Sequence, residues 1–481
     1  MIEFPRLLNR KAGILYKLFY FLVATLVIFL LAHHWSYDDP FITYRYANNI
    51  LNGNGFVYNA GEHILSTTTP LFTILLAGTG WIWSDLPQLA VLIGSASLAV
   101  GGLILFRLAG EYKTPLIGWL CLVLYPTFPL VIRTLGSETP LYLALILGAI
   151  LAYQRENYIV VGLLSGLAVV TRPDGLLVPA LLAIHFLFYR LAHRPFPWKA
   201  VLLFALINIS WFGFAWFYFG SPLPATLAAK QQQGMMAISQ RFLPGFITII
   251  NGYAPYWGYW VAAVLMVIGM AFVAKQRRWL ILLAWTAAYL AAYSILGVTR
   301  YFWYYAPLIP GFVVLVGAGF TALWNFHPRM DEKWQFIFRG AALVLILLLG
   351  LTQMLDLWRF RNVLDKRIAV YAEIGHWLDE NTSPNASIGS LEVGAIGYYA
   401  QRKMIDFAGL IQPDVARQLT RDATYEDAAL YAVSRYQPEY IVLIAGLFPE
   451  LRQGPILRNC SSLESFENGS VAVDLFECRW R

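Results

Sequence analysis

The stretch GILYKLFYFLVATLVIFLLAHHWSYDDPFITYR, residues 13–45, joins a long apolar run to two adjacent carboxylates, Asp38 and Asp39. Its apolar part, residues 13–32, is long enough to cross about 30 Å of hydrocarbon as a helix. Lys and Arg residues lie before and near the start of this run, and no small-x-small cleavage site follows it, so we expect an uncleaved anchor with a cytoplasmic N-terminus. The two acids then emerge on the opposite face. Like charges this close need donors or cations beside them, which makes the pair a candidate functional site.

The composition of the whole chain indicates a membrane protein with many spans. Of its 481 residues, 58% are hydrophobic and only 13% are charged, and the mean hydropathy is +0.57. Such a chain is too apolar to be soluble throughout its length. The apolar runs predict eleven membrane-spanning helices, at residues 13–32, 88–109, 115–132, 139–153, 158–171, 175–190, 199–219, 256–274, 279–297, 303–323 and 338–356.

The distribution of basic residues predicts the orientation of these spans. With eleven spans, 16 of the 22 Lys and Arg residues in residues 1–350 fall on the cytoplasmic side and six on the external side. This asymmetry obeys the positive-inside rule. The count requires that residues 70–83 do not cross the membrane. Because Thr69 and Pro70 suit the start of a helix, we expect an interfacial helix there, within one large external loop at 33–87.

The composition changes after residue 356. Residues 351–481 contain 13 basic and 17 acidic residues, a net charge of −4, whereas residues 1–350 have a net charge of +11. We therefore expect a transmembrane domain at 1–356 and an external, soluble α/β domain at 357–481. Cys460 and Cys478 both lie in the second domain, where an oxidising exterior would allow either a disulfide or two thiols. The predicted elements are helices at 366–379 and 394–399, two further helices, and strands at 387–391, 404–407, 440–444 and 471–478.

Charged residues collect where the predicted spans end on the external face. Few ionisable residues lie near the middle of a span, which argues against an ion-coupled transporter. Motifs typical of zinc hydrolases, P-loop enzymes and serine esterases do not occur in the sequence. Carboxylates beside cations suit a reaction that needs a base and a phosphate clamp. The external charged set comprises Asp38, Asp39, Arg45, Glu62, His63, Arg133, Glu138, Arg172, Asp174, Lys230, Arg241 and Arg300.

Several stretches resemble one family along nearly the whole chain. The run DDPFITYRYANNILNGNGFVYNAGE at 38–62, followed by STTTPLFTILLA at 66–77, resembles the first external loop of the GT-C superfamily of polyprenyl-phosphate-sugar-dependent glycosyltransferases. It is most similar to the branch with bacterial arabinofuranosyltransferases and relatives of dolichyl-phosphate-mannose protein mannosyltransferases. Further similar stretches are GSETPLYLAL at 136–145, TRPDGLL at 171–177, FGSPLPATLAAK at 219–230 and VGAIGYYAQRKMIDFAGL at 393–410.

The resemblance implies an α-helical polytopic GT-C fold and an inverting glycosyltransferase at the external face of the cytoplasmic membrane. Its donor would be a sugar linked through one phosphate to a polyprenol, and its acceptor a cell-wall glycan, a lipid or a protein. Such a leaving group needs no strong general acid, so one base and cations that hold the phosphate suffice. We expect no required cofactor and no metal, although a divalent cation could bind near the acids. The lipid bilayer is the other expected partner, and no nucleic acid is expected.

The acid pair is expected to divide its duties. Asp39 directly precedes Pro40, so it is suited to cap a helix at 41–51. Asp38 has no such structural role and is the preferred general base. Glu138 begins a predicted span, where an acid also favours a helix N-terminus, and the resemblance implies a site role for it.

The expected phosphate-binding cations are Lys230, Arg172 and Arg300. For each of them the alternative is snorkelling to lipid headgroups or pairing with an acid, which for Arg172 would be Asp174. Arg45, Glu62, His63 and Asp174 complete the candidate site residues, with an exposed turn pair as the alternative for Glu62 and His63.

Two other functions remain open from the sequence. A flippase or transporter of lipid-linked sugars would use the same external charges as a binding vestibule without chemistry. A non-catalytic scaffold whose tail recruits other enzymes is the third reading. Release of polyprenyl phosphate from a synthetic donor separates the transferase from both.

Overall fold

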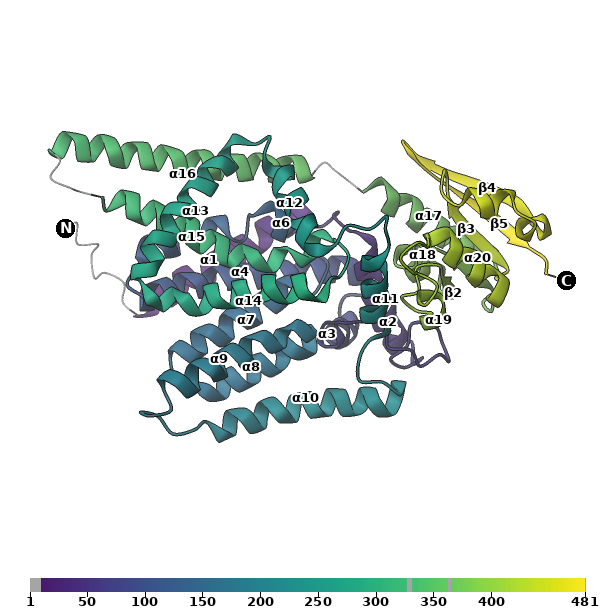
Figure 1. Cartoon of the computed structure of the whole chain (residues 1–481), viewed down its shortest axis with the longest axis horizontal. Coiled ribbons are helices and arrows are strands. Elements are labelled where there is room, and N and C mark those ends of the chain that lie inside the picture. The colour runs from purple at the N-terminus through teal and green to yellow at the C-terminus, as the bar shows by residue number, and fades with distance from the viewer. Residues whose placement is uncertain (1–9, 327–330, 362–364, 481) are drawn as a thin grey trace.

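A computed structural model describes residues 10–326, 331–361 and 365–480. The described chain forms a long helical bundle with a small α/β domain at one end (Figure 1). Helix α1 (Arg10–Ala32) begins at the end of the bundle away from that domain. Residues 1–9, for which we predict a cytoplasmic position, and residues 362–364 of the predicted external domain lie outside the described residues.

The predicted apolar runs fold as helices, most of which run roughly along the bundle (Figure 1). Short 3-10 turns, labelled η, interrupt or introduce some of them. After α1 the elements are α2 (Asp38–Leu51), α3 (Pro70–Gly80), α4 (Leu86–Glu111), α5 (Pro115–Leu124), α6 (Pro129–Ile132), α7 (Thr139–Gln154), α8 (Tyr158–Thr171), η1 (Pro173–Leu176), α9 (Leu177–Tyr189), α10 (Trp198–Phe219), α11 (Ala225–Met235), α12 (Phe242–Tyr253), α13 (Trp257–Lys275), η2 (Arg277–Trp279), α14 (Leu280–Leu296), η3 (Phe302–Tyr304), η4 (Ala306–Leu308), α15 (Ile309–Trp324) and α16 (Glu332–Arg361).

Seven helices in the described ranges are long and apolar enough to cross a membrane, against the eleven spans predicted. The predicted spans at 115–132, 139–153, 158–171 and 175–190 instead form helices of 10 to 16 residues. The first of these is broken after α5 because Pro126 and Pro129 cannot donate backbone hydrogen bonds and disfavour a helix at the residues before them.

Helix α3 begins at Pro70, as the sequence predicts. Phe72 and Leu76 are fully buried, and the helix packs against α2 and α8. Trp81 and Ile82, just past its end, are exposed. The segment is therefore anchored in the protein on one side and leaves large apolar side chains uncovered on the other.

Two glycines allow α13 and α15 to pack closely. A Cβ atom on Gly269 would lie 1.9 Å from the carbonyl oxygen of Leu315, and one on Gly319 would lie 1.9 Å from that of Leu265. Neither space can hold a side chain. The backbones of the two helices therefore touch, as small residues allow between membrane helices.

The C-terminal domain has a five-stranded sheet in the order β2-β1-β3-β5-β4. Strand β1 pairs in parallel with β2 and β3, whereas β5 runs antiparallel to both β3 and β4. The mixed α/β architecture matches the prediction, but strand β4 and helix α21 were not predicted. The elements are α17 (Lys366–Asn381), β1 (Ser387–Ser390), α18 (Ala395–Ala400), β2 (Lys403–Asp406), α19 (Pro413–Ala416), α20 (Tyr425–Tyr436), β3 (Tyr440–Ile444), α21 (Pro449–Gln453), η5 (Ile456–Asn459), β4 (Cys460–Asn468) and β5 (Val471–Cys478).

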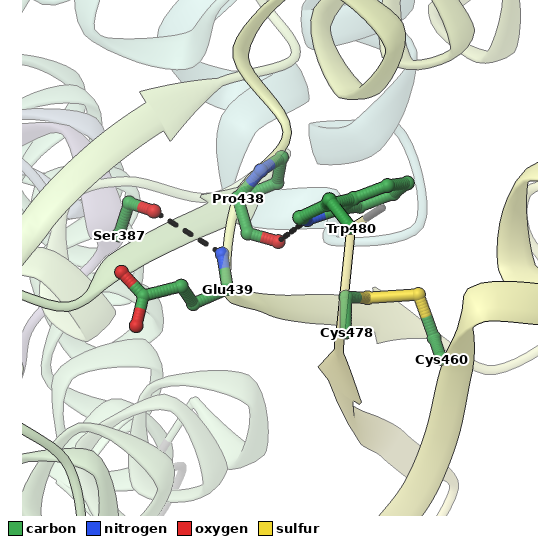
Figure 2. Close-up of a disulfide and its surroundings, with 6 residues drawn as sticks. All are labelled: Ser387, Pro438, Glu439, Cys460, Cys478 and Trp480. Atoms are coloured by element: carbon green, nitrogen blue, oxygen red, sulfur yellow. Dashed lines mark hydrogen bonds between the residues drawn. A yellow bond between two sulfur atoms is a disulfide. The ribbon is translucent and has the colours of Figure 1, made fainter.

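A disulfide joins Cys460 to Cys478, which decides between the two states that the sequence left open. The two residues face each other at the start of β4 and the end of β5 (Figure 2). Beyond the disulfide, the Trp480 indole donates to the carbonyl of Pro438 at 2.8 Å. The end of the described chain is thus fixed to the sheet. The third cysteine, Cys121, is buried in α5 as a thiol.

Arg45 connects the two domains. Its guanidinium is buried and donates to the carbonyls of Gly397 and Arg402 in the C-terminal domain, and to that of Tyr58 at 2.8 Å. The side chain of Asn59 extends the contact by exchanging hydrogen bonds of 2.9 and 3.0 Å with the backbone of Met404. Arg45, which we predicted as a site candidate, therefore holds the domains together.

Candidate active site

A cavity of about 500 Å³ lies where the bundle and the C-terminal domain meet. Its wall is built from the start of α2, the segment 66–69, η1, α11, α14 and η3, together with Leu410 of the C-terminal domain. The charged residues that line it are Asp39, Glu138, Arg172, Asp174 and Lys230. Half of the site residues predicted from the sequence are thus brought to one place.

Asp39 and Lys230 form an ion pair in this cavity. The Lys230 Nζ atom lies 3.4 Å from Asp39 Oδ2 and 3.9 Å from the centre of the Tyr301 ring. The lysine side chain is 9% exposed, whereas that of Asp39 is 34% exposed, so the carboxylate is the more accessible partner. Burial disfavours the charged lysine, but the charge of Asp39 outweighs it and raises the pKa of Lys230 above its ordinary value. The cavity therefore keeps a positive charge beside an accessible carboxylate.

The position of Lys230 follows from the sequence before it. Pro224 has an extended backbone, so α11 begins at Ala225. The N–H of Ala225 donates to the carbonyl of Leu65 at 2.8 Å. Gln233, about one turn after Lys230, accepts a hydrogen bond from the Tyr301 hydroxyl and donates one to the carbonyl of Ala408 in the C-terminal domain at 3.2 Å. Helix α11 is thus fixed at both ends.

Arg172 is saturated by protein groups. It donates to both oxygens of Asp174 at 3.1 Å, to Glu138 at 3.1 Å and to the Tyr293 hydroxyl at 2.8 Å. Burial alone would lower its pKa, but Asp174 and the neighbouring tyrosines and Glu138 raise the pKa of Arg172 above its ordinary value. Each guanidinium nitrogen has a protein partner. The pairing with Asp174 that the sequence offered as the alternative to a phosphate clamp is therefore confirmed.

Asp38 lies outside the cavity wall and contacts the C-terminal domain. Its carboxylate accepts the N–H groups of Gly394 at 2.9 Å and Ala395 at 2.8 Å, at the start of α18 in the C-terminal domain. Burial raises the pKa of Asp38 to about 6, against the opposing effect of these two donors. A Cβ atom on Gly394 would lie 2.0 Å from the Asp38 carbonyl oxygen, so only glycine permits this contact.

The expectation that Asp39 caps a helix is wrong. Helix α2 begins at Asp38 with Tyr37 as its N-cap, so Asp39 lies in the first turn and is not the cap. Asp39 lines the cavity and Asp38 does not. With both oxygens of Asp38 occupied by backbone donors, its geometry favours a structural role over that of a base.

Three other predicted residues lie outside the cavity wall. Arg300 is exposed, and its backbone N–H pairs with Gln240 at 2.7 Å. Glu62 forms an ion pair of 2.6 Å with Lys403 of the C-terminal domain. His63 is exposed and stacks on Tyr218 at 4.2 Å. Glu62 therefore supports the domain contact, and the other two are surface residues.

Sequence reasoning missed two acids of the C-terminal domain. Burial, with the charge of Asp38, raises the pKa of Glu392 to about 8. Asp406 is fully buried, accepts the N–H groups of Ala408 and Ile411, and has a pKa raised by burial to about 7. By holding this turn, Asp406 fixes Leu410 in the cavity wall. Both acids border or lie within the 393–410 stretch that resembles the family, which was the available signal.

An apolar groove of about 280 Å³ adjoins the cavity. It shares Thr67, Thr68, Pro173, Leu176 and Pro224 with the cavity wall. The rest of its wall is mostly apolar, with four residues of α10 and Val169 of α8. A ligand with a polar head and an apolar tail could therefore occupy both spaces at once.

Among the described residues, no group of three or more His, Cys, Asp or Glu has an arrangement that could hold a metal ion. The carboxylates of Glu138 and Asp174 instead share the guanidinium of Arg172. A fixed positive charge therefore already lies between them.

Two comparisons of sequence report related proteins. Residues 361–475 match a family described as Domain of unknown function (DUF8728). Over 270 residues the chain is 27% identical to the terminal beta-(1->2)-arabinofuranosyltransferase of Mycobacterium tuberculosis (strain ATCC 25618 / H37Rv). That match covers 51% of this chain and 42% of the relative, so the chain spans less than half the length of the curated relative.

The fold is similar to those of solved membrane enzymes. ArnT from Cupriavidus metallidurans bound to undecaprenyl phosphate is similar at a TM-score of 0.64 and 12% identity, over 97% of this chain and 98% of that chain. The Archaeoglobus fulgidus oligosaccharyltransferase tethered with an acceptor peptide is similar at a TM-score of 0.60 and 13% identity, over 89% of this chain and 69% of that chain. The chain therefore has a GT-C-like fold, as the sequence resemblance implied.

Proposed function

We propose that this protein is an inverting glycosyltransferase that moves a sugar from a polyprenyl-phosphate donor to an acceptor hydroxyl on the external face of the cytoplasmic membrane. The observation that carries the proposal is the pair of Asp39 and Lys230 in a cavity that adjoins an apolar groove. A carboxylate, a fixed ammonium and an apolar channel correspond to the proton, phosphate and isoprenoid of such a reaction.

In the proposed reaction, Asp39 takes the proton of the acceptor hydroxyl as its oxygen attacks the anomeric carbon. The bond between that carbon and the phosphate oxygen breaks, and the electron pair leaves with polyprenyl phosphate. A single displacement inverts the anomeric configuration. Lys230 neutralises the negative charge that grows on the departing phosphate, and its contact with the Tyr301 ring holds it in place.

The arrangement of the cavities supports a lipid-linked donor. Thr67 and Thr68 line both the charged cavity and the apolar groove, so the two spaces share part of one wall. The names of similar proteins point in the same direction, since one transfers arabinofuranose and another was solved with undecaprenyl phosphate. We therefore propose a pentose or hexose donor on a polyprenyl phosphate, with a glycan, lipid or protein acceptor.

We further propose that the reaction needs no metal. Arg172 lies between Glu138 and Asp174, and Lys230 lies beside Asp39, so a protein cation already accompanies each of these acids. Treatment with EDTA should change the rate by less than about twofold, because these charges remain. Loss of activity with EDTA, restored by one divalent cation, would contradict this part of the proposal.

The test uses the full chain, purified and placed in liposomes, with prenyl-phosphate-linked arabinofuranose, mannose and glucose as donors. Release of prenyl phosphate, followed with time in the presence of a sugar acceptor, is the expected result for at least one donor. Movement of a fluorescent donor across the bilayer without release would instead support the flippase. The Asp39→Asn variant is the control for release that does not depend on the enzyme.

A further inference from the structure

One wall of the cavity is made of hydroxyl groups. The segment Ser66 to Thr69 and the residues Thr43 and Thr226 line it together. Hydroxyls both donate and accept hydrogen bonds, unlike the carboxylates and cations that also line the cavity. The cavity therefore has one charged region and one uncharged polar region.

Two of these hydroxyls are buried without a partner. The Ser66 and Thr226 side-chain oxygens have no hydrogen bond among the described residues, although the residues are only 2% and 6% exposed. A buried hydroxyl without a partner costs free energy, so a partner supplied by a ligand would be favourable.

The two residues are placed side by side by the backbone. The N–H of Ala225 donates to the carbonyl of Leu65 at 2.8 Å, and Ser66 and Thr226 are the residues that follow. Thr226 also lies four residues before Lys230, so the two side chains share one face of α11. The unpartnered hydroxyls are thus part of the same surface as the proposed phosphate-binding lysine.

Three neighbouring threonines, Thr43, Thr67 and Thr69, form a row in which one hydroxyl hydrogen is not donated within the row. The Thr69 hydroxyl lies 3.1 Å from that of Thr43 and 3.1 Å from that of Thr67. Three hydroxyls offer three hydrogens, but the two contacts within the row use two. In the described residues no other acceptor for the third is found, so it can be donated to a ligand in the cavity.

We propose that Ser66 and Thr226, together with the threonine row, bind ring hydroxyls of the donor sugar and so select a pentose or hexose without an acidic group. This inference rests on the proposed function. Groups that both donate and accept complement sugar hydroxyls. Three carboxylates against two cations give the cavity wall a net negative charge, which disfavours an acidic sugar. Specificity would arise because an analogue lacking a hydroxyl leaves the protein hydroxyl unpaired.

The test measures KM and kcat for prenyl phosphate release with the best donor of the sugar panel and with analogues of it that lack one ring hydroxyl each. The Thr226→Val variant, which keeps the shape but loses the hydroxyl, should raise KM for the complete donor roughly tenfold. The Thr226→Ser variant keeps the hydroxyl and should change KM by less than about threefold. For one deoxy donor, the wild type and Thr226→Val should have equal KM values.

The matched control is Thr321→Val, a buried threonine in α15 that bonds only within its own helix. It should leave KM for every donor unchanged. If Thr226→Val does not fold, as judged by its thermal unfolding, Ser66→Ala tests the same wall with the same expectation.

Two outcomes overturn the inference and are distinct. In the first, the wild type releases prenyl phosphate, but the variants lose the same activity with every donor or lose none. The hydroxyls of Ser66 and Thr226 then do not bind the ring hydroxyls of the sugar. A prenyl-linked uronic acid used as well as the neutral sugar also defeats the selection proposed here. If the wild type releases prenyl phosphate from no donor, the proposed function itself fails.

Discussion

Asp38 and Asp39 are neighbours in the sequence but serve two regions of the molecule. Asp39 lines the cavity beside Lys230, while Asp38 accepts two backbone N–H groups from the C-terminal domain. Successive side chains of a helix point about 100° apart, so the first turn of α2 directs one carboxylate to each region. A pair of acids in a sequence therefore need not be a pair in function.

The largest expected effect comes from exchanging these two acids one at a time. Asp39→Asn should lower prenyl phosphate release by roughly 10²- to 10⁴-fold, because it removes the proposed base, with little change in thermal unfolding. Asp38→Asn should lower the unfolding temperature and reduce release by less than about tenfold, since one amide oxygen can still accept. A larger loss of activity in the Asp38 variant than in the Asp39 variant would contradict the assignment of Asp39 as the base.

Removal of the cavity cation should have the next largest effect. Lys230→Met keeps the aliphatic stem and should lower kcat/KM for release by roughly 100-fold, because the leaving phosphate loses its counter-charge. Lys230→Arg should recover part of this loss. Arg300→Met, which changes an exposed cation outside the cavity wall, is the matched control and should retain activity. Equal losses of activity in Lys230→Met and Arg300→Met would show that the loss does not come from the cavity cation.

The domain contact can be weakened without touching the cavity wall. Arg45→Met should lower the free energy of unfolding by about 3 kcal/mol, because several buried carbonyls lose their donor. Thermal unfolding and the rate of proteolysis of the C-terminal domain measure this effect. Arg458→Met, an exposed residue of the same domain, should leave both unchanged. An unchanged unfolding temperature in the Arg45 variant would show that this contact contributes little.

Stability should also depend on pH. Folding raises the pKa of Asp38 from 3.8 to about 6 and that of Glu392 from 4.5 to about 8. The folded state therefore binds protons more tightly, and the stability from these groups is complete below pH 4 and is lost as pH rises toward 8.

The thermal unfolding temperature should accordingly fall by a few degrees between pH 5 and pH 8, and Glu392→Gln should reduce that fall. Glu380→Gln, at an exposed position near the end of α17, is the control and should retain the full pH dependence. A wild type that becomes more stable over this range would contradict the assignment.

The sequence predicted much of the fold because its strongest patterns are local. The apolar runs form helices, and α3 begins at Pro70. Strands β1, β2, β3 and β5 lie close to their predicted ranges. Seven of the eleven predicted spans are helices long and apolar enough to cross a membrane, whereas α5, α7, α8 and α9 are shorter apolar helices. Strand β4 was missed because most of its side chains are exposed and polar.

The candidate site was predicted less completely because it depends on contacts between distant residues. The set of external charges included Asp39, Lys230 and Glu138, which the structure brings together. Arg45 and Asp38 look like the others in sequence, yet they contact residues more than 350 positions away. No local pattern records such contacts.

The sequence by itself determined that the chain is a helical membrane protein with a second α/β domain, because length, hydropathy and charge act locally. It also predicted that a set of carboxylates and cations would lie on one face, and five of these residues line the cavity. Only the tertiary structure decided which acid faces the cavity, that Arg172 is already paired, and that hydroxyls of Ser66 and Thr226 lie together without partners. These distinctions depend on where each side chain points and on which groups it contacts. Both are set by the packing of residues that are distant in the sequence.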